Sequence, residues 1–298
     1  MEYHNPVLLN ECIEGLNIKP TGIYVDVTFG GGGHSALILQ KLKGGKLYAF
    51  DQDEKANEND LKKEGFKLIN ANFRKIKNFL RMEGVKKIDG LLADLGVSSH
   101  QFDEGERGFS IRFNGDLDMR MNIHSPLSAK EVVNKYSEED LANVLYNYGE
   151  LTNSRKIAAE IVRSRENHPI TTTNELIACV SHLVPEKKKN QFLARLFQAI
   201  RIEVNDEIGA LEEMLNSAVD LLDENGRLVV LSYHSLEDRM VKNLFKKGNI
   251  EGVLEKDFFG NPNKVLKEIN RKVIIASDNE IANNSRARSA KLRIAEKI

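Results

Sequence analysis

The first hundred residues alternate between short β-rich runs and stretches with helical periodicity, and this alternation most constrains what the chain can fold into. The β-rich runs lie at 22–28, 46–50, 67–69 and 88–93, and residues 35–43 carry Leu and Ala at helical spacing. Strands that are separated by helices form parallel βαβ units with right-handed crossovers. The sequence therefore predicts an α/β fold built on a parallel sheet.

The alternation stops after about residue 104. Residues 106–122 are rich in glycine and charge without any period, which predicts an ordered loop. Strand signals are then absent from about 125 to 220, while capping-box patterns stand at Ser128-Ala-Lys-Glu131 and Thr172-Thr-Asn-Glu175. We therefore expect an all-helical domain inserted into the α/β domain.

Strand character returns near the end of the chain. The turn Asn225-Gly226 precedes the β-rich residues 227–232, and a capping box from Ser235 to Asp238 predicts the next helix. Residues 272–276 and 290–295 are expected to form an edge hairpin. The expected domains are an α/β domain of residues 1–104 and 206–298 and an inserted helical domain of residues 105–205.

The composition limits the class of protein. With 43 Lys and Arg against 44 Asp and Glu, the net charge of −1 indicates no general affinity for nucleic acid, so any basic surface is local. Cys12 and Cys179 are too few for a disulfide framework or a cysteine-rich zinc site, and His4 and His34 lack the spacing of a metal site. The polar first ten residues do not resemble a signal peptide, and no apolar run approaches the roughly 20 residues that span a bilayer. We expect a cytoplasmic protein without a membrane segment and without a metal.

A glycine cluster, Phe29-Gly-Gly-Gly-Gly-His34, joins the first predicted strand to the first predicted helix. Glycines there let the backbone approach a ligand closely, and a helix N-terminus favours anionic or polar groups. The strict pattern G-x-G-x-x-G fails because Ser35 takes the third position, and no Gly-Lys-Ser/Thr of a P-loop follows. Asp51 closes the second strand, where a carboxylate accepts hydrogen bonds from ribose hydroxyls. The cluster and Asp51 together predict a nucleoside-containing ligand without saying which one.

Two further strand ends carry polar or aromatic residues. Phe73 follows the third strand, where it can stack on a purine, although a lone Phe more often belongs to the core. Asp94 ends the fourth strand, with Ser98, Ser99 and Gln101 just beyond it. Ligands of open α/β sheets bind outside the carboxyl ends of the strands, so these residues are expected to share one site.

Several long segments resemble one family. They include Thr28-Phe-Gly-Gly-Gly-Gly-His34, Asp94-Leu-Gly-Val-Ser-Ser-His-Gln101 and Ser232-Tyr-His-Ser-Leu-Glu-Asp-Arg239, and the others are residues 3–9, 106–110, 117–121, 195–205 and 284–289. On these motifs the chain resembles the bacterial 16S ribosomal RNA cytosine-N4 methyltransferases of the MraW type. The resemblance covers essentially the whole chain.

This resemblance implies a class I (Rossmann-like) methyltransferase sheet interrupted by an inserted all-helical domain. It implies S-adenosylmethionine as methyl donor and one cytosine in the decoding region of the small-subunit RNA as substrate, so that the partner is 16S rRNA or the small ribosomal subunit. The α/β domain then binds the donor and the helical domain recognises the substrate. The donor-binding residues that the family motifs imply are Gly32, Gly33, His34, Asp51, Phe73, Asp94 and Gln101.

The chemistry requires positioning more than a strong nucleophile, because a sulfonium methyl is already activated. Cytosine's exocyclic amine is a poor nucleophile, and a hydrogen-bond acceptor aimed at its protons would localise its lone pair. The Asp/Asn/Ser-Pro-Pro-Tyr/Phe motif of many exocyclic-amine methyltransferases is absent, so we hypothesise that the loop from Asp94 to Ser99 orients the amine. Tyr233 or His234 stacking on the extruded base is a further hypothesis. The sequence identifies no catalytic base.

Two segments are locally basic. Residues 155–201 and residues 264–298 each hold nine basic and four acidic residues, which is compatible with RNA phosphate binding. Taken alone, each run is more often a solvated face.

Two other functions stay open at this stage. A nicotinamide-dependent oxidoreductase would suit Asp51 and a looser glycine pattern that ends in alanine, which Gly31, Gly33 and Ala36 fit. No proton-relay residues are recognisable, however. A non-catalytic RNA-binding assembly factor would keep the same fold as a scaffold. The sequence also leaves the oligomeric state open, with a dimer among the options.

Overall fold

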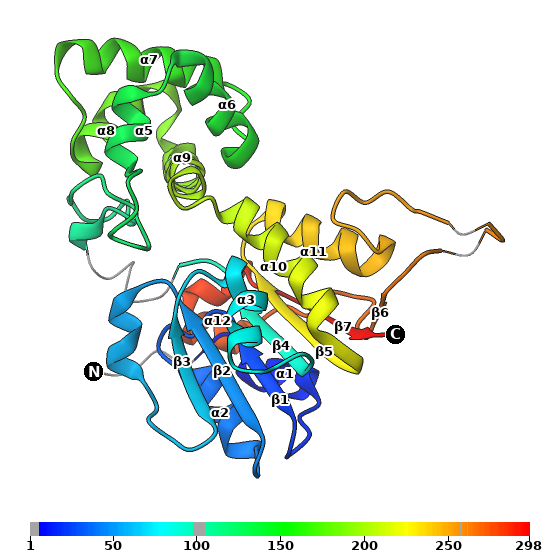
Figure 1. Ribbon diagram of the computed structural model, residues 1–298. Coiled ribbons are helices and arrows are strands. Elements are labelled where there is room, and N and C mark those ends of the chain that lie inside the picture. Colours follow the sequence, from blue (N-terminus) through cyan, green and yellow to red (C-terminus); the bar gives the residue numbers. More distant parts are fainter. Residues whose placement is uncertain (1–5, 98–104, 257, 261) are drawn as a thin grey trace. The chain divides into compact units, whose positions relative to one another are not determined.

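The computed structural model describes residues 6–97, 105–256, 258–260 and 262–298. The chain forms two compact units (Figure 1), one of Met1–Gly96 with Ile208–Ile298 and the other of Val97–Glu207. Each unit has a hydrophobic core of its own. None of the helices in the described part of the chain has the length and apolar character that crossing a bilayer requires.

The first unit is built on a seven-stranded sheet in the order β3-β2-β1-β4-β5-β7-β6. The five strands β1 to β5 are parallel, and β7 runs antiparallel to both β5 and β6. The strands are β1 (Ile23–Asp26), β2 (Lys46–Asp51), β3 (Phe66–Asn70), β4 (Ile88–Asp94), β5 (Leu222–Ser232), β6 (Leu266–Glu268) and β7 (Lys291–Lys297). The predicted α/β class with a parallel sheet is confirmed.

Apolar side chains point to both faces of this sheet. In β4, for example, Leu91 packs in one core cluster and its neighbour Leu92 in another, because successive strand residues face opposite sides. Helices cover both faces, as parallel sheets require (Figure 1). The helices of this unit are α1 (Leu9–Leu16), α2 (Gly33–Lys41), α3 (Ile76–Met82), α10 (Glu207–Leu221), α11 (Ser235–Lys247) and α12 (Asp278–Asn283), with 3-10 turns η1 (Glu54–Asn59), η2 (Phe73–Lys75) and η5 (Ser285–Ser289).

The strand order reverses between β1 and β4. The chain builds outward from β1 through β2 to β3 on one side, and from β4 through β5 on the other. Such a reversal is the place where open α/β sheets bind their ligands, at the carboxyl ends of the strands. The residues that follow β1, β2 and β4 therefore define the candidate site.

The second unit is helical. Its elements are η3 (Gly105–Arg107), α5 (Ala129–Lys135), α6 (Glu138–Gly149), α7 (Ser154–Asn167), α8 (Thr173–Val180), η4 (Ser181–Leu183) and α9 (Glu186–Asn205). Both predicted capping boxes are present, at Ser128 with Glu131 and at Thr172 with Glu175. The predicted helical insertion is confirmed as part of the fold.

The glycine-rich loop before α5 is ordered by side chains instead of by regular structure. The Asn205 side chain accepts a hydrogen bond from the Met121 N–H at 2.7 Å and donates to the Met119 carbonyl at 2.8 Å. Asp118 holds the Arg120 guanidinium through both carboxylate oxygens. These contacts fix the loop within the helical unit.

The predicted edge hairpin is wrong in its first strand. Residues 272–276 form only an isolated bridge, from Ile274 to Leu292, and the edge strand is β6. The cause is Asn270, whose side chain donates to the Leu292 carbonyl at 3.1 Å and accepts from the Ile294 N–H at 2.7 Å. The side-chain amide thus takes the Ile294 N–H, which a carbonyl of a longer partner strand would use, whereas the Leu292 carbonyl still accepts from the Ile274 N–H at 3.1 Å.

Candidate functional site at the carboxyl ends of the strands

The glycine loop passes from β1 into α2 with little room to spare. Gly32 has φ +77°, and a Cβ there would lie 2.9 Å from the Phe29 ring. A Cβ on Gly33 would lie 2.2 Å from Cγ of Pro6. The N-cap residue of α2 is Gly32, which has no side chain to accept from the first N–H groups of the helix. This backbone can take a polar or anionic ligand group at the helix N-terminus.

Asp51 lies at the end of β2 and ties the glycine loop to this strand. Its Oδ2 accepts the Gly30 N–H at 2.8 Å, and its Oδ1 accepts the Asp53 N–H at 2.9 Å. Burial raises the pKa of Asp51 to about 6, although these two hydrogen bonds oppose the shift. The carboxylate is therefore held in place and is unusually easy to protonate.

Asp94 ends β4 and is held by three different elements. Its N–H donates to the Thr28 hydroxyl at 2.6 Å, and the Tyr233 hydroxyl donates to its Oδ1 at 2.7 Å. His34 places Nδ1 3.8 Å from Oδ2 of Asp94. Burial raises the pKa of Asp94, while His34 and the Tyr233 hydroxyl act in the opposite direction.

The His34 side chain points into the protein. It is buried, and Nε2 lies 3.2 Å from the Val7 carbonyl oxygen, on the side of the ring opposite to Asp94. His34 therefore links the segment before α1, the start of α2 and the end of β4. Its contribution to a ligand would come from its backbone at the start of α2.

Asp26 is a residue of the site that the sequence reasoning missed. It ends β1, is 1% exposed, and accepts hydrogen bonds from the Ser35 hydroxyl at 2.7 Å and the Thr28 N–H at 3.1 Å. Burial raises the pKa of Asp26, and His34 opposes the shift. Asp26 lies within the β-rich run 22–28, and its place near the carboxyl end of that run, four residues before Gly30, was the available signal.

Phe73 follows β3 in the short turn η2 and is half-buried against the core on one face of the sheet. Asn72, which caps this turn, donates to the Gln52 side chain at 2.8 Å and so joins the ends of β3 and β2. Gln101, like Ser98 and Ser99, lies outside the described residues. The structure thus brings Gly32, Gly33, His34, Asp51 and Asp94 together around one loop and places Phe73 at the adjoining strand end.

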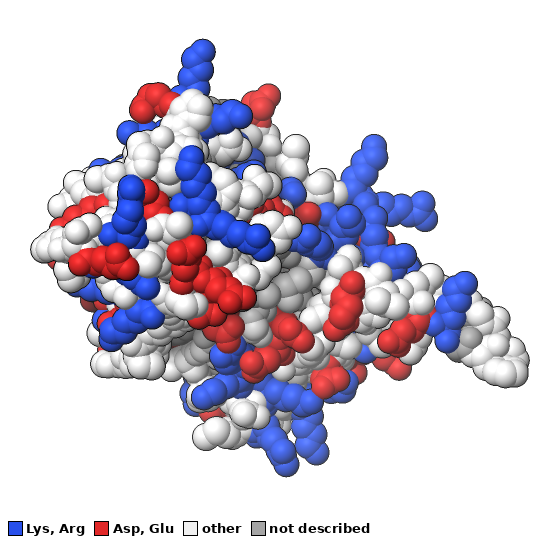
Figure 2. All heavy atoms as spheres, turned by 90° about the horizontal axis from the view of Figure 1, so that it is seen from above, with Lys and Arg blue, Asp and Glu red and all other residues white. Residues whose placement is uncertain are grey.

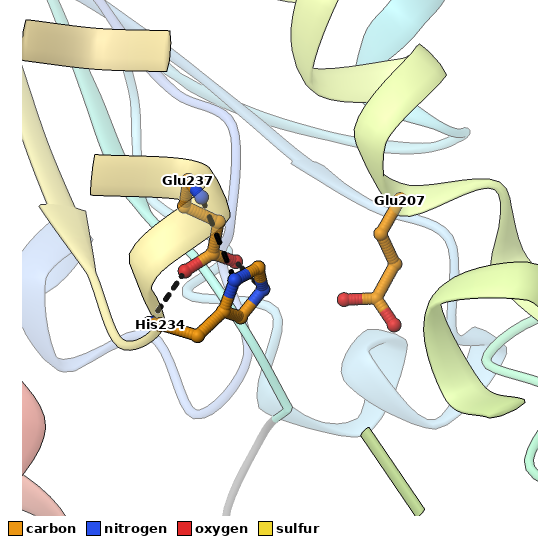
Figure 3. A group of neighbouring side chains, drawn as sticks. All are labelled: Glu207, His234 and Glu237. Atoms are coloured by element: carbon orange, nitrogen blue, oxygen red, sulfur yellow. Dashed lines mark hydrogen bonds and ion pairs between the residues drawn. The ribbon is translucent and has the colours of Figure 1, made fainter. Parts of the chain in front are cut away.

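The turn after β5 positions Tyr233. The buried Glu237 accepts hydrogen bonds from the N–H groups of Tyr233 at 2.8 Å and His234 at 3.3 Å. His234, not Ser235, caps α11, and its ring nitrogen Nδ1 accepts from the Glu237 N–H (Figure 3). The predicted capping box therefore begins one residue earlier than expected, because an imidazole can replace the usual hydroxyl as acceptor.

The basic segments are partly committed to contacts within the protein. Arg201 pairs with Glu207 through two hydrogen bonds, and Arg165 donates to the carbonyls of Val133 and Tyr136. Lysine and arginine side chains are interspersed with acidic ones over the face shown in Figure 2. The count of basic residues in the sequence therefore overstates the charge offered to a nucleic acid.

A doubly wound sheet of this order, with a glycine loop after β1 and carboxylates at the ends of β1, β2 and β4, defines a class I methyltransferase fold. The family model for the MraW methylase family matches residues 1–298, so the chain belongs to that family.

Curated relatives agree with the family assignment. A protein of Flavobacterium johnsoniae named ribosomal RNA small subunit methyltransferase H is 57% identical over 299 residues, covering 100% of this chain and 99% of the relative. A protein of the same name from Phocaeicola vulgatus is 55% identical and covers 99% of this chain and 97% of the relative. A solved rRNA methylase from Streptococcus thermophilus aligns over 97% of this chain and 93% of its own at 14% identity and a TM-score of 0.43, which adds nothing to the assignment. Of the functions considered from sequence, a methyltransferase is the one that the family supports.

Proposed function

We propose that this protein transfers the methyl group of S-adenosylmethionine to N4 of one cytosine in the decoding region of 16S rRNA. The observation that carries the proposal is that Asp51 and Asp94, from the ends of the two strands that flank β1, lie against the glycine loop and the first residues of α2 in a chain of the MraW methylase family. The full-length relatives named as small-subunit rRNA methyltransferases support the substrate class. The choice of cytosine N4 rests on the motif resemblance.

The residues present suit a sulfonium nucleoside. Asp51 would accept the two ribose hydroxyls, and the backbone of Gly32, Gly33 and His34 would approach the methionine part of the donor. Phe73 and Asp94 would flank the adenine and methionine ends, with Gln101 beyond. When bound, the donor supplies an activated methyl group, so the protein's task is to align the reacting atoms and exclude water, which is worth roughly 7–11 kcal/mol.

Asp94 is the group proposed to act on the acceptor. A carboxylate that accepts a hydrogen bond from the cytosine amine makes its lone pair more available as the transition state forms. Thr28 and Tyr233 fix the backbone and the carboxylate of Asp94, which keeps the acceptor in one orientation. Such fixed acceptors need no reorganisation during the reaction.

The helical unit is proposed to recognise the RNA, with the α/β unit binding the donor. Three consecutive lysines, Lys187, Lys188 and Lys189, lie in the first turns of α9. Replacing all three by Glu should raise the KM for the RNA substrate and reduce its salt dependence, because phosphate contacts release counterions. Affinity for S-adenosylmethionine, measured by titration calorimetry, should stay unchanged. An unchanged KM for the RNA would show that these three lysines do not contact it.

Two measurements test the proposed reaction and target. Mass spectrometry of 16S rRNA from cells that lack the protein should show the loss of one methylcytosine, and re-expression should restore it. Purified protein should transfer radiolabelled methyl to small subunits or to 16S rRNA from those cells. If the rRNA of such cells keeps all its methylcytosines, the proposed substrate is wrong. This reaction would place the protein in the cytoplasm with the ribosomal subunits.

A further inference from the structure

The contact between Tyr233 and Asp94 joins two parts of the chain that are 139 residues apart. Tyr233 follows β5 and Asp94 ends β4, and these strands are neighbours in the sheet, with Asp94 opposite Leu231. The hydroxyl of Tyr233 lies 2.7 Å from Oδ1 of Asp94. The contact lies wholly within the α/β unit.

The Tyr233 ring is itself held in place. Its backbone N–H is fixed by the buried Glu237, and its ring lies against Gly96, where an added Cβ would stand 3.4 Å from Cδ2. Gly96 has φ +105°, so the chain turns two residues after Asp94, beside this ring. Tyr233 therefore supports both the Asp94 carboxylate and the turn that follows it.

We propose that Tyr233 is a positioning residue for methyl transfer: its hydroxyl occupies Oδ1 of Asp94 and leaves Oδ2 as the oxygen that meets the donor or the cytosine amine. This role rests on the proposed function of Asp94 and differs from stacking on the base, because it depends on the hydroxyl and not on the ring. Tyr233 acts through Asp94 and need not touch either substrate.

The electrostatic surroundings of Asp94 give the proposal a specific signature. Burial favours the protonated carboxyl, and among the residues that the structure describes the Tyr233 hydroxyl and His34 oppose it. The titratable groups that act on Asp94 are His34 from α2, Tyr233 after β5, Asp26 from β1, Glu237 from α11 and Cys12 from α1. Removing only the Tyr233 hydroxyl takes a donor from the ionised form, so the pKa of Asp94 rises.

The test compares Tyr233→Phe with Tyr24→Phe. Tyr24 is a matched control because it is also buried in the α/β unit, and its hydroxyl accepts from the Lys19 N–H at 2.7 Å. In Tyr233→Phe we expect kcat/KM to fall about tenfold and the acid limb of its pH profile to move up by roughly one unit, as loss of a hydrogen bond to a charged group predicts. Tyr24→Phe should keep the wild-type profile.

Asp94→Asn provides the coupling test. In that background Tyr233→Phe should have no further effect, because the carboxylate on which the hydroxyl acts is gone. Additive losses in the double variant, or a wild-type pH profile in Tyr233→Phe, would overturn the positioning role. If Tyr233→Phe keeps wild-type activity while Tyr233→Leu is inactive, activity depends on the aromatic ring and not on the hydroxyl, and the positioning role is wrong.

A second readout separates this inference from the proposed function. Affinity for S-adenosylhomocysteine, measured by calorimetry without RNA, should show the same upward shift of its acid limb in Tyr233→Phe. If wild-type protein fails to methylate the rRNA but the binding shift appears, the substrate assignment fails and the coupling of Tyr233 to Asp94 stands. If the wild type methylates the rRNA but Tyr233→Phe shifts neither the pH profile of kcat/KM nor that of S-adenosylhomocysteine affinity, the positioning role of Tyr233 is wrong and the proposed function stands.

Discussion

The protonation of Asp51 should control the affinity of the protein for its methyl donor. The Asp51 carboxylate is expected to accept the ribose hydroxyls, and only the ionised form can accept both. Burial raises its pKa to about 6 in the free protein, well above the ordinary value for aspartate. Lowering the pH should therefore weaken binding in a range where most carboxylates are still ionised.

The magnitude follows from the ionised fraction. With a pKa of about 6, Asp51 is almost fully ionised near pH 8 and only about one-tenth ionised near pH 5. If the donor binds the ionised form, Kd rises about twofold by about pH 6 and about tenfold by about pH 5. The sign is set by the raised pKa: affinity is complete above it and is lost as the pH falls through it.

Titration calorimetry with S-adenosylhomocysteine at several pH values measures this dependence. Asp51→Asn should bind about tenfold more weakly or worse near pH 8, and the step in Kd near pH 6 should disappear. Asp89→Asn is the matched control. Asp89 lies near the amino end of β4, at the opposite edge of the sheet from the candidate site, and its carboxylate pairs with Lys19 at 2.7 Å. A Kd that is flat from about pH 8 to about pH 5 in the wild type would refute the reasoning, as would a step at the pKa of Asp51, about 6, that is unchanged in Asp51→Asn.

Two further predictions concern the glycine loop and the helical unit. Gly33→Ala should lower donor affinity at least about tenfold, because its Cβ would stand 2.2 Å from Pro6 and force the glycine loop away from the segment that contains Pro6. Calorimetry measures the affinity, and a wild-type value would show that Pro6 moves aside at little cost. Asn205→Ala should destabilise the helical unit by about 1–3 kcal/mol, since the Met119 carbonyl and the Met121 N–H lose their hydrogen-bond partner. Proteolysis within residues 105–125 should become faster. An unchanged unfolding midpoint would contradict the predicted destabilisation.

The sequence determined the parts of the fold that depend on local pattern. Alternating β-rich and helical stretches gave the parallel sheet, and the capping boxes at Ser128 and Thr172 gave helix starts within the insertion. The glycine cluster and the acids Asp51 and Asp94 were recognisable because each lies at the carboxyl end of a predicted strand. Local backbone preference and side-chain periodicity are properties of a short segment, so they can be recognised without knowing the rest of the fold.

Local pattern failed where distant groups compete for the same backbone. Residues 272–276 contain the β-branched run Val273, Ile274 and Ile275, which is typical of a strand, but the Asn270 side chain takes the Ile294 N–H of β7 that a longer strand would need. His234 replaced Ser235 as the helix cap because Glu237 is buried beneath the turn. In each case a single side-chain contact outweighed the local preference.

The partners of the site residues were decided by tertiary structure alone. Nothing near Asp94 in the sequence indicates that Tyr233 donates to it, because the sheet pairs β4 with β5 only after the chain has passed through the whole helical unit. The burial of Asp26 and the raised pKa of Asp51 also come from tertiary structure, since both depend on how the chain packs around the strand ends. Residue type and spacing set which groups the chain can offer, whereas strand order and burial set which of them meet and how they are charged.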